Sequence, residues 1–155
     1  SSLAAPTAQS VYNLAHEILT PAATVTLTLN EHAGKLLLIP SVFSGNDTYQ
    51  LPIPSFIGET YKFIFAGITA DSDNIIFAAP SANALTFTGS ILDIDANDTG
   101  AARIVVKYRT SSDDDKYTIT NVENMNLTFV ATTLTNYNVY GVAVSTDTAG
   151  SFGDL

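Results

Sequence analysis

The chain has 155 residues, of which 46% are hydrophobic, so it can fold as one domain around a core of its own. Its 15 acidic and 6 basic residues give a formal net charge of −9, which argues against a broad basic surface for nucleic acid. The absence of cysteine excludes disulfides and thiolate metal sites. No apolar run approaches the roughly 20 residues of a membrane-spanning helix, so no membrane partner is expected.

Residues 1–22 are expected to form an N-terminal arm. Val11, Leu14 and Ile18 recur at helical spacing, which suits a short amphipathic helix, and an extended arm is the alternative. Pro21 ends the segment in either case. Because an arm that orders on binding can cover a large surface, these three apolar residues are candidates for contacts with a neighbouring protein.

The chain then reads as short strands separated by turns. Residues 24–29 alternate threonine with valine or leucine, which is typical of a strand with one wet face. Residues 31–34 are a predicted turn, and residues 35–39 form an almost wholly apolar, buried strand. Residues 49–53 form a short strand that two nearby prolines place at a sheet edge.

The most strongly patterned stretch runs from Gly58 to Pro80. Tyr61, Phe63 and Phe65 alternate along one face of a predicted strand, and a second β-branched and aromatic run covers residues 75–79. The acidic, small-residue segment between these runs has turn chemistry. The pattern predicts a β-hairpin or β-arch whose strands lie near the centre of a sheet.

Five further strands follow in the same style. In residues 103–108, Ile104, Val106 and Tyr108 share one face. The other four are predicted over residues 84–92, 116–120, 126–132 and 137–144. Regular turn signals predict an all-β fold, an antiparallel β-sandwich or small barrel of about ten short strands. It forms a single domain over residues 23–145, and residues 146–155 are predicted to be a flexible tail.

One loop resembles the beginning of a calcium-binding loop. Asp93, Asp95, Asn97 and Asp98 place oxygen ligands close together, as Ca²⁺ requires. The sixth position is Asp98 where glycine is expected, and the twelfth is Ile104 where glutamate is expected. A solvated acidic turn is therefore favoured over a metal site. The aspartate run 113–115 is read in the same way.

Catalytic chemistry has little support in the sequence. The two histidines, His16 and His32, each lie next to a glutamate, but a metal or acid–base role needs further groups that converge in space. The chain lacks the nucleophile elbow, the phosphate-binding glycine loop and the zinc-protease motif. No catalytic residue and no cofactor are predicted, and the chain is not expected to be an enzyme.

Several predicted strands are apolar on both faces, which exceeds what a small sandwich needs inside. Tyr61, Phe63, Tyr137 and Tyr140 are therefore candidates for contacts between subunits. The alternative, with equal weight, is that these aromatic side chains fill a single core.

Three stretches carry a resemblance to a known class of proteins. The first is Leu27–Ile39, in which a polar turn and Gly-Lys join an alternating strand to an aliphatic one. The second is Leu51–Phe65, with a Leu-Pro turn, a glycine and an aromatic-Lys-Phe strand. The third is the closing strand Tyr137–Ser145. In this order and spacing they resemble the small head-decoration proteins of tailed bacteriophages.

The resemblance implies a non-enzymatic protein that is made in the host cytoplasm and binds the outer surface of the capsid. It further implies that the partner is the major capsid protein and that the chain forms homo-oligomers, with trimers at local three-fold positions favoured. The alternative is a β-sandwich module of a viral or bacterial appendage that binds calcium or a glycan.

Overall fold

The computed structural model describes residues 18–21, 24–39, 45–65, 74–98, 104–146 and 151–155. A seven-stranded sheet contains, in spatial order, β1 (Ile18–Leu19), β3 (Leu36–Ile39), β5 (Thr60–Phe65), β10 (Val122–Thr133), β11 (Asn136–Ser145), β7 (Thr86–Asp95) and β8 (Ile104–Tyr108). A five-stranded sheet contains β12 (Ser151–Gly153), β9 (Lys116–Thr120), β6 (Asn74–Ala78), β4 (Asp47–Gln50) and β2 (Val25–Thr26).

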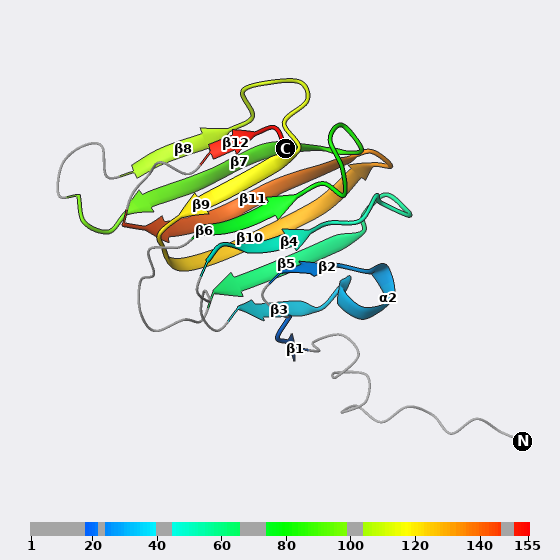
Figure 1. The fold of residues 1–155 in the computed structure, drawn as a ribbon, viewed down its shortest axis with the longest axis horizontal. Coiled ribbons are helices and arrows are strands. Elements are labelled where there is room, and N and C mark those ends of the chain that lie inside the picture. The colour runs from blue at the N-terminus through cyan, green and yellow to red at the C-terminus, as the bar shows by residue number, and fades with distance from the viewer. Residues whose placement is uncertain (1–17, 22–23, 40–44, 66–73, 99–103, 147–150) are drawn as a thin grey trace, which may run out of the picture.

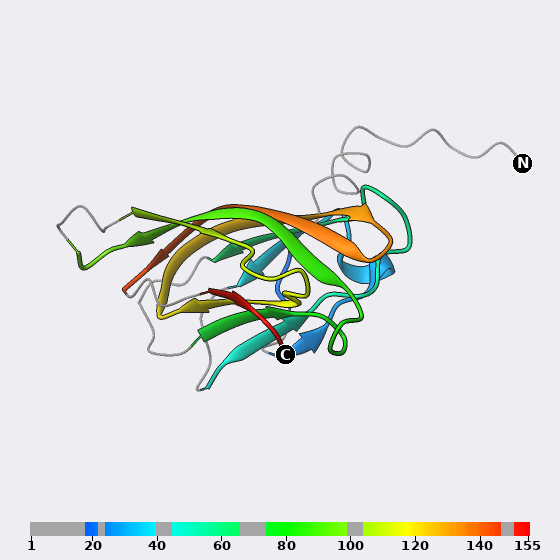
Figure 2. The same ribbon diagram turned by 90° about the horizontal axis from the view of Figure 1, so that it is seen from above.

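The two sheets form the layers of a sandwich (Figures 1 and 2). In Figure 2 the seven-stranded sheet is the upper layer and the five-stranded sheet the lower one. The predicted all-β sandwich is confirmed, and because the described strands belong to two separate sheets, the barrel alternative is not adopted. None of the helices in the described ranges has the length and hydrophobicity of a membrane-crossing segment.

The strands are paired in a mixed manner, whereas the sequence predicts antiparallel sheets. From β2 to β7 the chain alternates between the two sheets, so strands that follow one another seldom become neighbours. As a result β3 pairs with β5 and β4 with β6, both in parallel. β11 also pairs with β7 in parallel. Only β7–β8 and β10–β11 are neighbours both in the described sheets and in strand order.

The stretch from Gly58 to Pro80 is a β-arch and not a hairpin. Its first strand, β5, lies in the seven-stranded sheet and its second, β6, in the five-stranded sheet. Both strands are interior members of their sheets, as the sequence predicts. Each sends aromatic side chains inward, and Phe63 and Phe77 meet with their ring centroids 4.7 Å apart.

A cluster of aromatic rings between the sheets forms the centre of the core. Phe129 on β10 lies 4.9 Å from Phe77 and 5.5 Å from Phe87, measured between ring centroids. Tyr49 lies 5.6 Å from Phe63 and 5.8 Å from Phe77. Because these rings come from strands of both sheets, they fix how one layer sits on the other.

Three predictions in the N-terminal half need correction. The strand expected over residues 24–29 ends at Thr26, because Thr28 caps the short helix α2 (Leu29–His32) and accepts a hydrogen bond from the Glu31 N–H. This helix takes the first half of the predicted turn at residues 31–34, and residues 33–34 form a turn as predicted. The strand β4 ends before the prolines and lies between β2 and β6, so it is not an edge strand.

The two ends of the described chain are more ordered than predicted. Residues 151–153 are not a flexible tail but form β12, which pairs with β9, and the ring of Phe152 lies 4.7 Å from that of Tyr117. The Asp115 carboxylate accepts hydrogen bonds from the N–H groups of Leu155 and Asn83. Ile18, assigned to the arm, pairs with Leu36 in the sheet. Residues 1–17, including Val11 and Leu14, lie outside the described residues.

Candidate functional site

The four aromatic interface candidates divide into two groups. Tyr61, Phe63 and Tyr137 are fully buried between the sheets, so the prediction that they contact another subunit is wrong and they fill the core. Tyr140 remains half exposed, because three residues after Tyr137 on β11 the side chain points to the opposite face of the sheet. Of the four aromatic candidates, Tyr140 is the one that can meet a partner.

A buried carboxylate explains why two of these tyrosines belong to the core. Glu59 is 1% exposed, and its Oε1 accepts hydrogen bonds from the hydroxyls of Tyr61 at 2.7 Å and Tyr137 at 3.0 Å. Its Oε2 accepts from the Ser55 N–H at 2.7 Å. Burial, and then the neighbouring Glu59, raise the pKa of the Tyr61 hydroxyl. No sequence pattern singles out Glu59. Its hydrogen bonds tie the loop at Ser55 to the core tyrosines.

The acidic loop does not gather its oxygens in one place. Asp93 is buried and accepts a hydrogen bond from the Ser145 hydroxyl at 3.1 Å. Asp95 instead accepts from the backbone N–H groups of Asn97 and Asp98, so its carboxylate closes the turn. Within the described ranges no group of three or more His, Cys, Asp or Glu residues could hold a metal ion. The calcium-loop reading therefore gains no support from the geometry.

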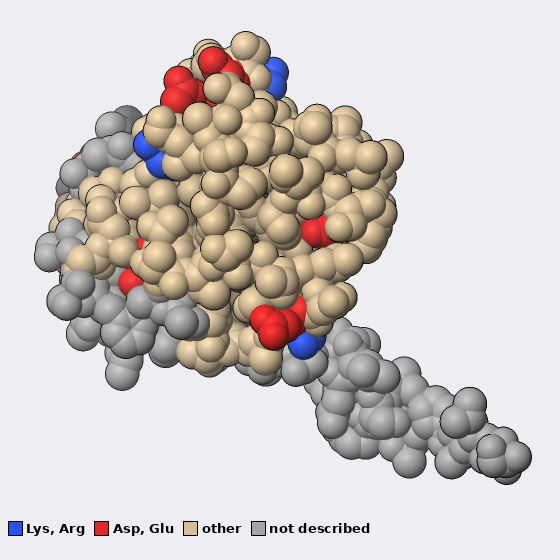
Figure 3. All heavy atoms as spheres, turned by 45° about the vertical axis from the view of Figure 1, so that its right-hand side comes forward, with Lys and Arg blue, Asp and Glu red and all other residues tan. Residues whose placement is uncertain are grey.

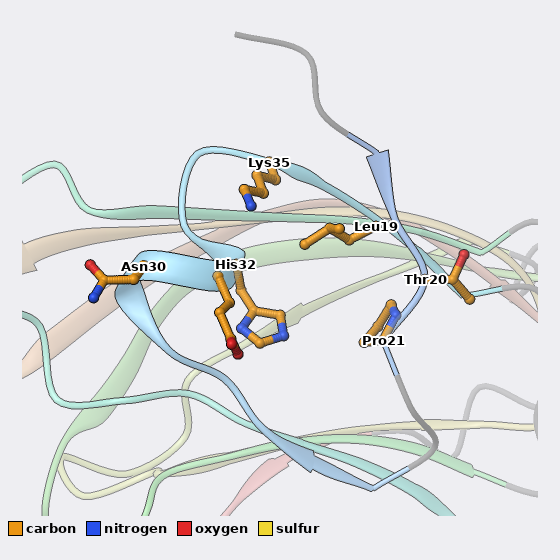
Figure 4. Close-up of a pocket in the computed structure, with 7 residues that line it drawn as sticks. Leu19, Thr20, Pro21, Asn30, His32 and Lys35 are labelled. Atoms are coloured by element: carbon orange, nitrogen blue, oxygen red, sulfur yellow. The ribbon is translucent and has the colours of Figure 1, made fainter. Parts of the chain in front are cut away.

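His32 lies at the wall of an open cavity of about 420 Å³ (Figure 4). The imidazole is 8% exposed, and its Nδ1 accepts a hydrogen bond from the Thr28 N–H at 3.1 Å, which places the ring proton on Nε2. This hydrogen bond ties the last residue of α2 back to its N-cap residue, Thr28. The cavity is lined by Leu19, Thr20, Pro21, Asn30, Glu31, His32 and Lys35. Apart from the imidazole, this lining has no aromatic side chain. His16 lies outside the described residues.

The most distinctive surface lies on the outer face of the seven-stranded sheet, near β8. The side chains of Ile104, Val106 and Tyr108 are 58%, 56% and 64% exposed, and they alternate along β8 as the sequence predicts. Single exposed apolar residues are common on proteins, but three on one strand face are a patch.

The patch extends over two further strands through three rows of paired residues. Ile104 pairs with Ile94, which pairs with Val144. The two remaining rows are Val106–Leu92–Val142 and Tyr108–Ser90–Tyr140. Because paired residues share a face of the sheet, these nine side chains form one surface, which we call the outer patch.

The outer patch carries no formal charge on a protein whose net charge is −9. On the side toward β10 the patch is bordered by the exposed Asn124 and Asn126, which pair with Val144 and Val142. The buried Thr128 pairs with Tyr140. An apolar centre that contains tyrosine and is bordered by polar residues is typical of protein interfaces. The sequence carries this signal, since β8 has three apolar residues on one face and β11 has apolar residues on both faces.

A second exposed apolar group lies at the end of the sandwich that carries the β4–β5 loop and the β10–β11 turn. Ile53, Phe56, Ile57 and Leu134 are each at least half exposed. This end comes forward in Figure 3, where the charged side chains gather in small groups around a wide uncharged area. Exposed apolar side chains therefore gather at this end of the sandwich as well as on the outer patch.

Comparison with known proteins gives no family for the chain. No protein-family model matches it, and no curated protein matches it.

Proposed function

We propose that this chain is a virion structural protein that decorates the outside of a tailed-phage head and binds the major capsid protein. The function is adhesive: many identical copies occupy lattice sites and bridge coat subunits against the pressure of packed DNA. A modest affinity at each contact is enough, because contacts engaged together hold far more strongly than any one alone.

The observation that supports this proposal best is the outer patch. An uncharged surface with exposed Tyr108, Tyr140 and Val106 can be desolvated at low electrostatic cost when it meets another protein. The acidic remainder of the surface opposes non-specific association elsewhere on the protein. The sandwich behind the patch is a rigid support, since its aromatic core joins both sheets.

The buried carboxylates suit a structural role better than a catalytic one. Glu59, Asp114 and Asp115 each accept hydrogen bonds from backbone N–H groups, so their oxygens hold loops and the C-terminal residue Leu155 in place. The glycan-binding alternative would rely on the cavity beside His32, whose lining lacks the aromatic residues that ligand pockets favour. We therefore do not adopt it.

The test is co-sedimentation of the purified protein with heads of the virus that encodes it, prepared without this protein. We expect saturable binding at a fixed ratio of copies to coat subunits, and heads that resist heat better once decorated. Deleting residues 1–10 should leave the fold intact and lower occupancy, if the arm reaches a neighbour. Heads that bind no protein at micromolar concentration would overturn the proposal.

A further inference from the structure

We propose that two copies of the chain join through β8, paired antiparallel across a two-fold axis at Val106. The partner is a second copy of this chain, and the pairing extends the seven-stranded sheet across both copies. The inference needs no capsid, so it stands or falls separately from the proposed function.

The first ground is that β8 is an edge. It pairs with β7 from Ile94–Ile104 to Ser90–Tyr108, and in the described part of the chain no strand pairs with its other side. It lies along the upper edge of the seven-stranded sheet in Figure 1. An edge strand is a template for another strand, and proteins usually guard such edges with proline, bulges or charged side chains. β8 has no proline and no bulge in its pairing with β7, and it carries one charged side chain, Lys107, on the face opposite to Val106. The outward side chains of β8 are isoleucine, valine and tyrosine.

The second ground is that the β8 sequence is self-complementary about its centre. Antiparallel pairing about Val106 places Ile104 opposite the second copy's Tyr108, an aromatic and β-branched pair of the kind that stabilises sheets. Val106 faces its own equivalent. Lys107, the one formal charge of β8, lies opposite the second copy's Val105, so the two lysines are not directly opposed.

The third ground is electrostatic. Each copy carries a net charge of −9, which opposes association over most of the surface. The outer patch, which begins at β8, is a region without formal charge, so two copies meet there with little repulsion. Pairing through a two-fold axis also closes on itself, as most stable homo-oligomers do.

The pairing has a consequence for the outer patch. The three rows of each copy become rows that continue into the other copy, so one uncharged surface spans the dimer. A surface of doubled extent offers more apolar area to a lattice of protein subunits than one copy does. The edge is used between copies, and the face stays available for a different partner.

The first experiment measures the molar mass of the full chain in solution by light scattering over a concentration series. We expect twice the protomer mass for the unchanged protein. Val106→Asp places two carboxylates against each other at the two-fold axis, and should weaken association at least tenfold and give the protomer mass. The control is Ile57→Asp, in an exposed loop residue (69%), which should keep the doubled mass.

A protomer mass up to millimolar concentration, a trimer mass, or a Val106→Asp variant as associated as the unchanged protein would each overturn the proposal. Circular dichroism of both variants checks that they fold. The outcome is independent of head binding. A chain that fails to bind heads can still pair through β8, and a chain that does not pair can still bind heads.

The second experiment uses the absence of native cysteine to read the register. In the proposed pair, Val106→Cys faces itself at about 4.5–5.5 Å between Cα atoms, within reach of a disulfide. Ile104→Cys lies about 13 Å from its equivalent and should not cross-link alone. The double variant Ile104→Cys/Tyr108→Cys should cross-link, because each new cysteine lies opposite the other new cysteine of the second copy. Equal cross-linking of Val106→Cys and Ile104→Cys would indicate random collision and overturn the proposal.

Discussion

The inner and outer faces of β11 are built from similar residues and have different roles. Tyr137 points inward, is fully buried and donates its hydroxyl to Glu59, whereas Tyr140 on the same strand points outward and is half exposed. Both faces are apolar, and the five-stranded sheet covers only the inner one. The comparison teaches that an apolar face becomes core or contact surface according to what lies over it, which is a property of topology.

The largest expected effect comes from pH acting on the buried tyrosines. Burial is the main cause that raises the pKa of Tyr49, Tyr61, Tyr117 and Tyr137 above the ordinary value of about 10. Above that pH the unfolded chain releases these protons while the folded chain keeps them. The contribution of these tyrosines to the free energy of unfolding is therefore fully present below about pH 10. Above that pH it falls by about 1.4 kcal/mol per pH unit for each tyrosine.

Denaturant unfolding at a series of pH values, followed together with tyrosinate absorbance, measures this effect. The buried tyrosines should ionise only as the chain unfolds. Tyr137→Phe should make the loss of stability with pH shallower by one proton. Ionisation of all the tyrosines in a chain that stays folded would contradict the assignment of four of them to the core.

A substitution on each face gives the next largest contrast. Phe129→Ala removes a fully buried ring from the aromatic cluster and should cost about 3–5 kcal/mol of the free energy of unfolding. Tyr140→Ala, on the outer patch, should change that free energy by about 0.5 kcal/mol or less. Chemical denaturation of both variants checks the pair. Comparable losses would mean that the outer face is covered in the free protein.

A smaller effect is expected at the C-terminal strand. Phe152 is 5% exposed and packs on Tyr117, so Phe152→Ala should cost about 2 kcal/mol, less than a central core residue because β12 is a short edge strand. The matched change is Leu155→Ala, at a half-exposed side chain, which should be close to neutral. A neutral Phe152→Ala would restore the view of a loose tail.

The smallest expected effect is that of calcium. Asp93 is buried and Asp95 closes its own turn, so millimolar Ca²⁺ should leave the melting temperature unchanged. Thermal unfolding with Ca²⁺ and with a chelator measures this. A rise in melting temperature that disappears in Asp95→Asn would revive the ligand-binding alternative.

Sequence periodicity predicted the faces of the strands well, and their neighbours poorly. The alternation of Ile104, Val106 and Tyr108 is confirmed, because a strand's side-chain period is local. The mixed pairing was not predictable, because chain crossings between sheets depend on long-range packing. The same limit applies to Tyr61, which is predicted as an interface candidate. The alternation of apolar residues around it does not indicate whether the other sheet covers that face.

The burial of two loop aspartates was also not predictable from the sequence. The aspartate run 113–115 is predicted to be solvated, yet Asp114 and Asp115 are each 1% exposed. Asp114 accepts hydrogen bonds from the N–H groups of Thr110 and Ser111, and Asp115 from that of Leu155. The backbone donors that make such burial favourable become visible only when the chain is folded.

Head binding by Tyr140→Asp tests the central claim most directly, because it puts a charge into the outer patch without touching the core. The matched control is Leu134→Asp, at a similarly exposed apolar residue in the turn of the same β10–β11 hairpin. Both variants should keep the melting temperature of the unchanged protein. We expect Leu134→Asp to co-sediment with heads normally and Tyr140→Asp to lose at least tenfold in affinity; equal binding by the two would contradict the account.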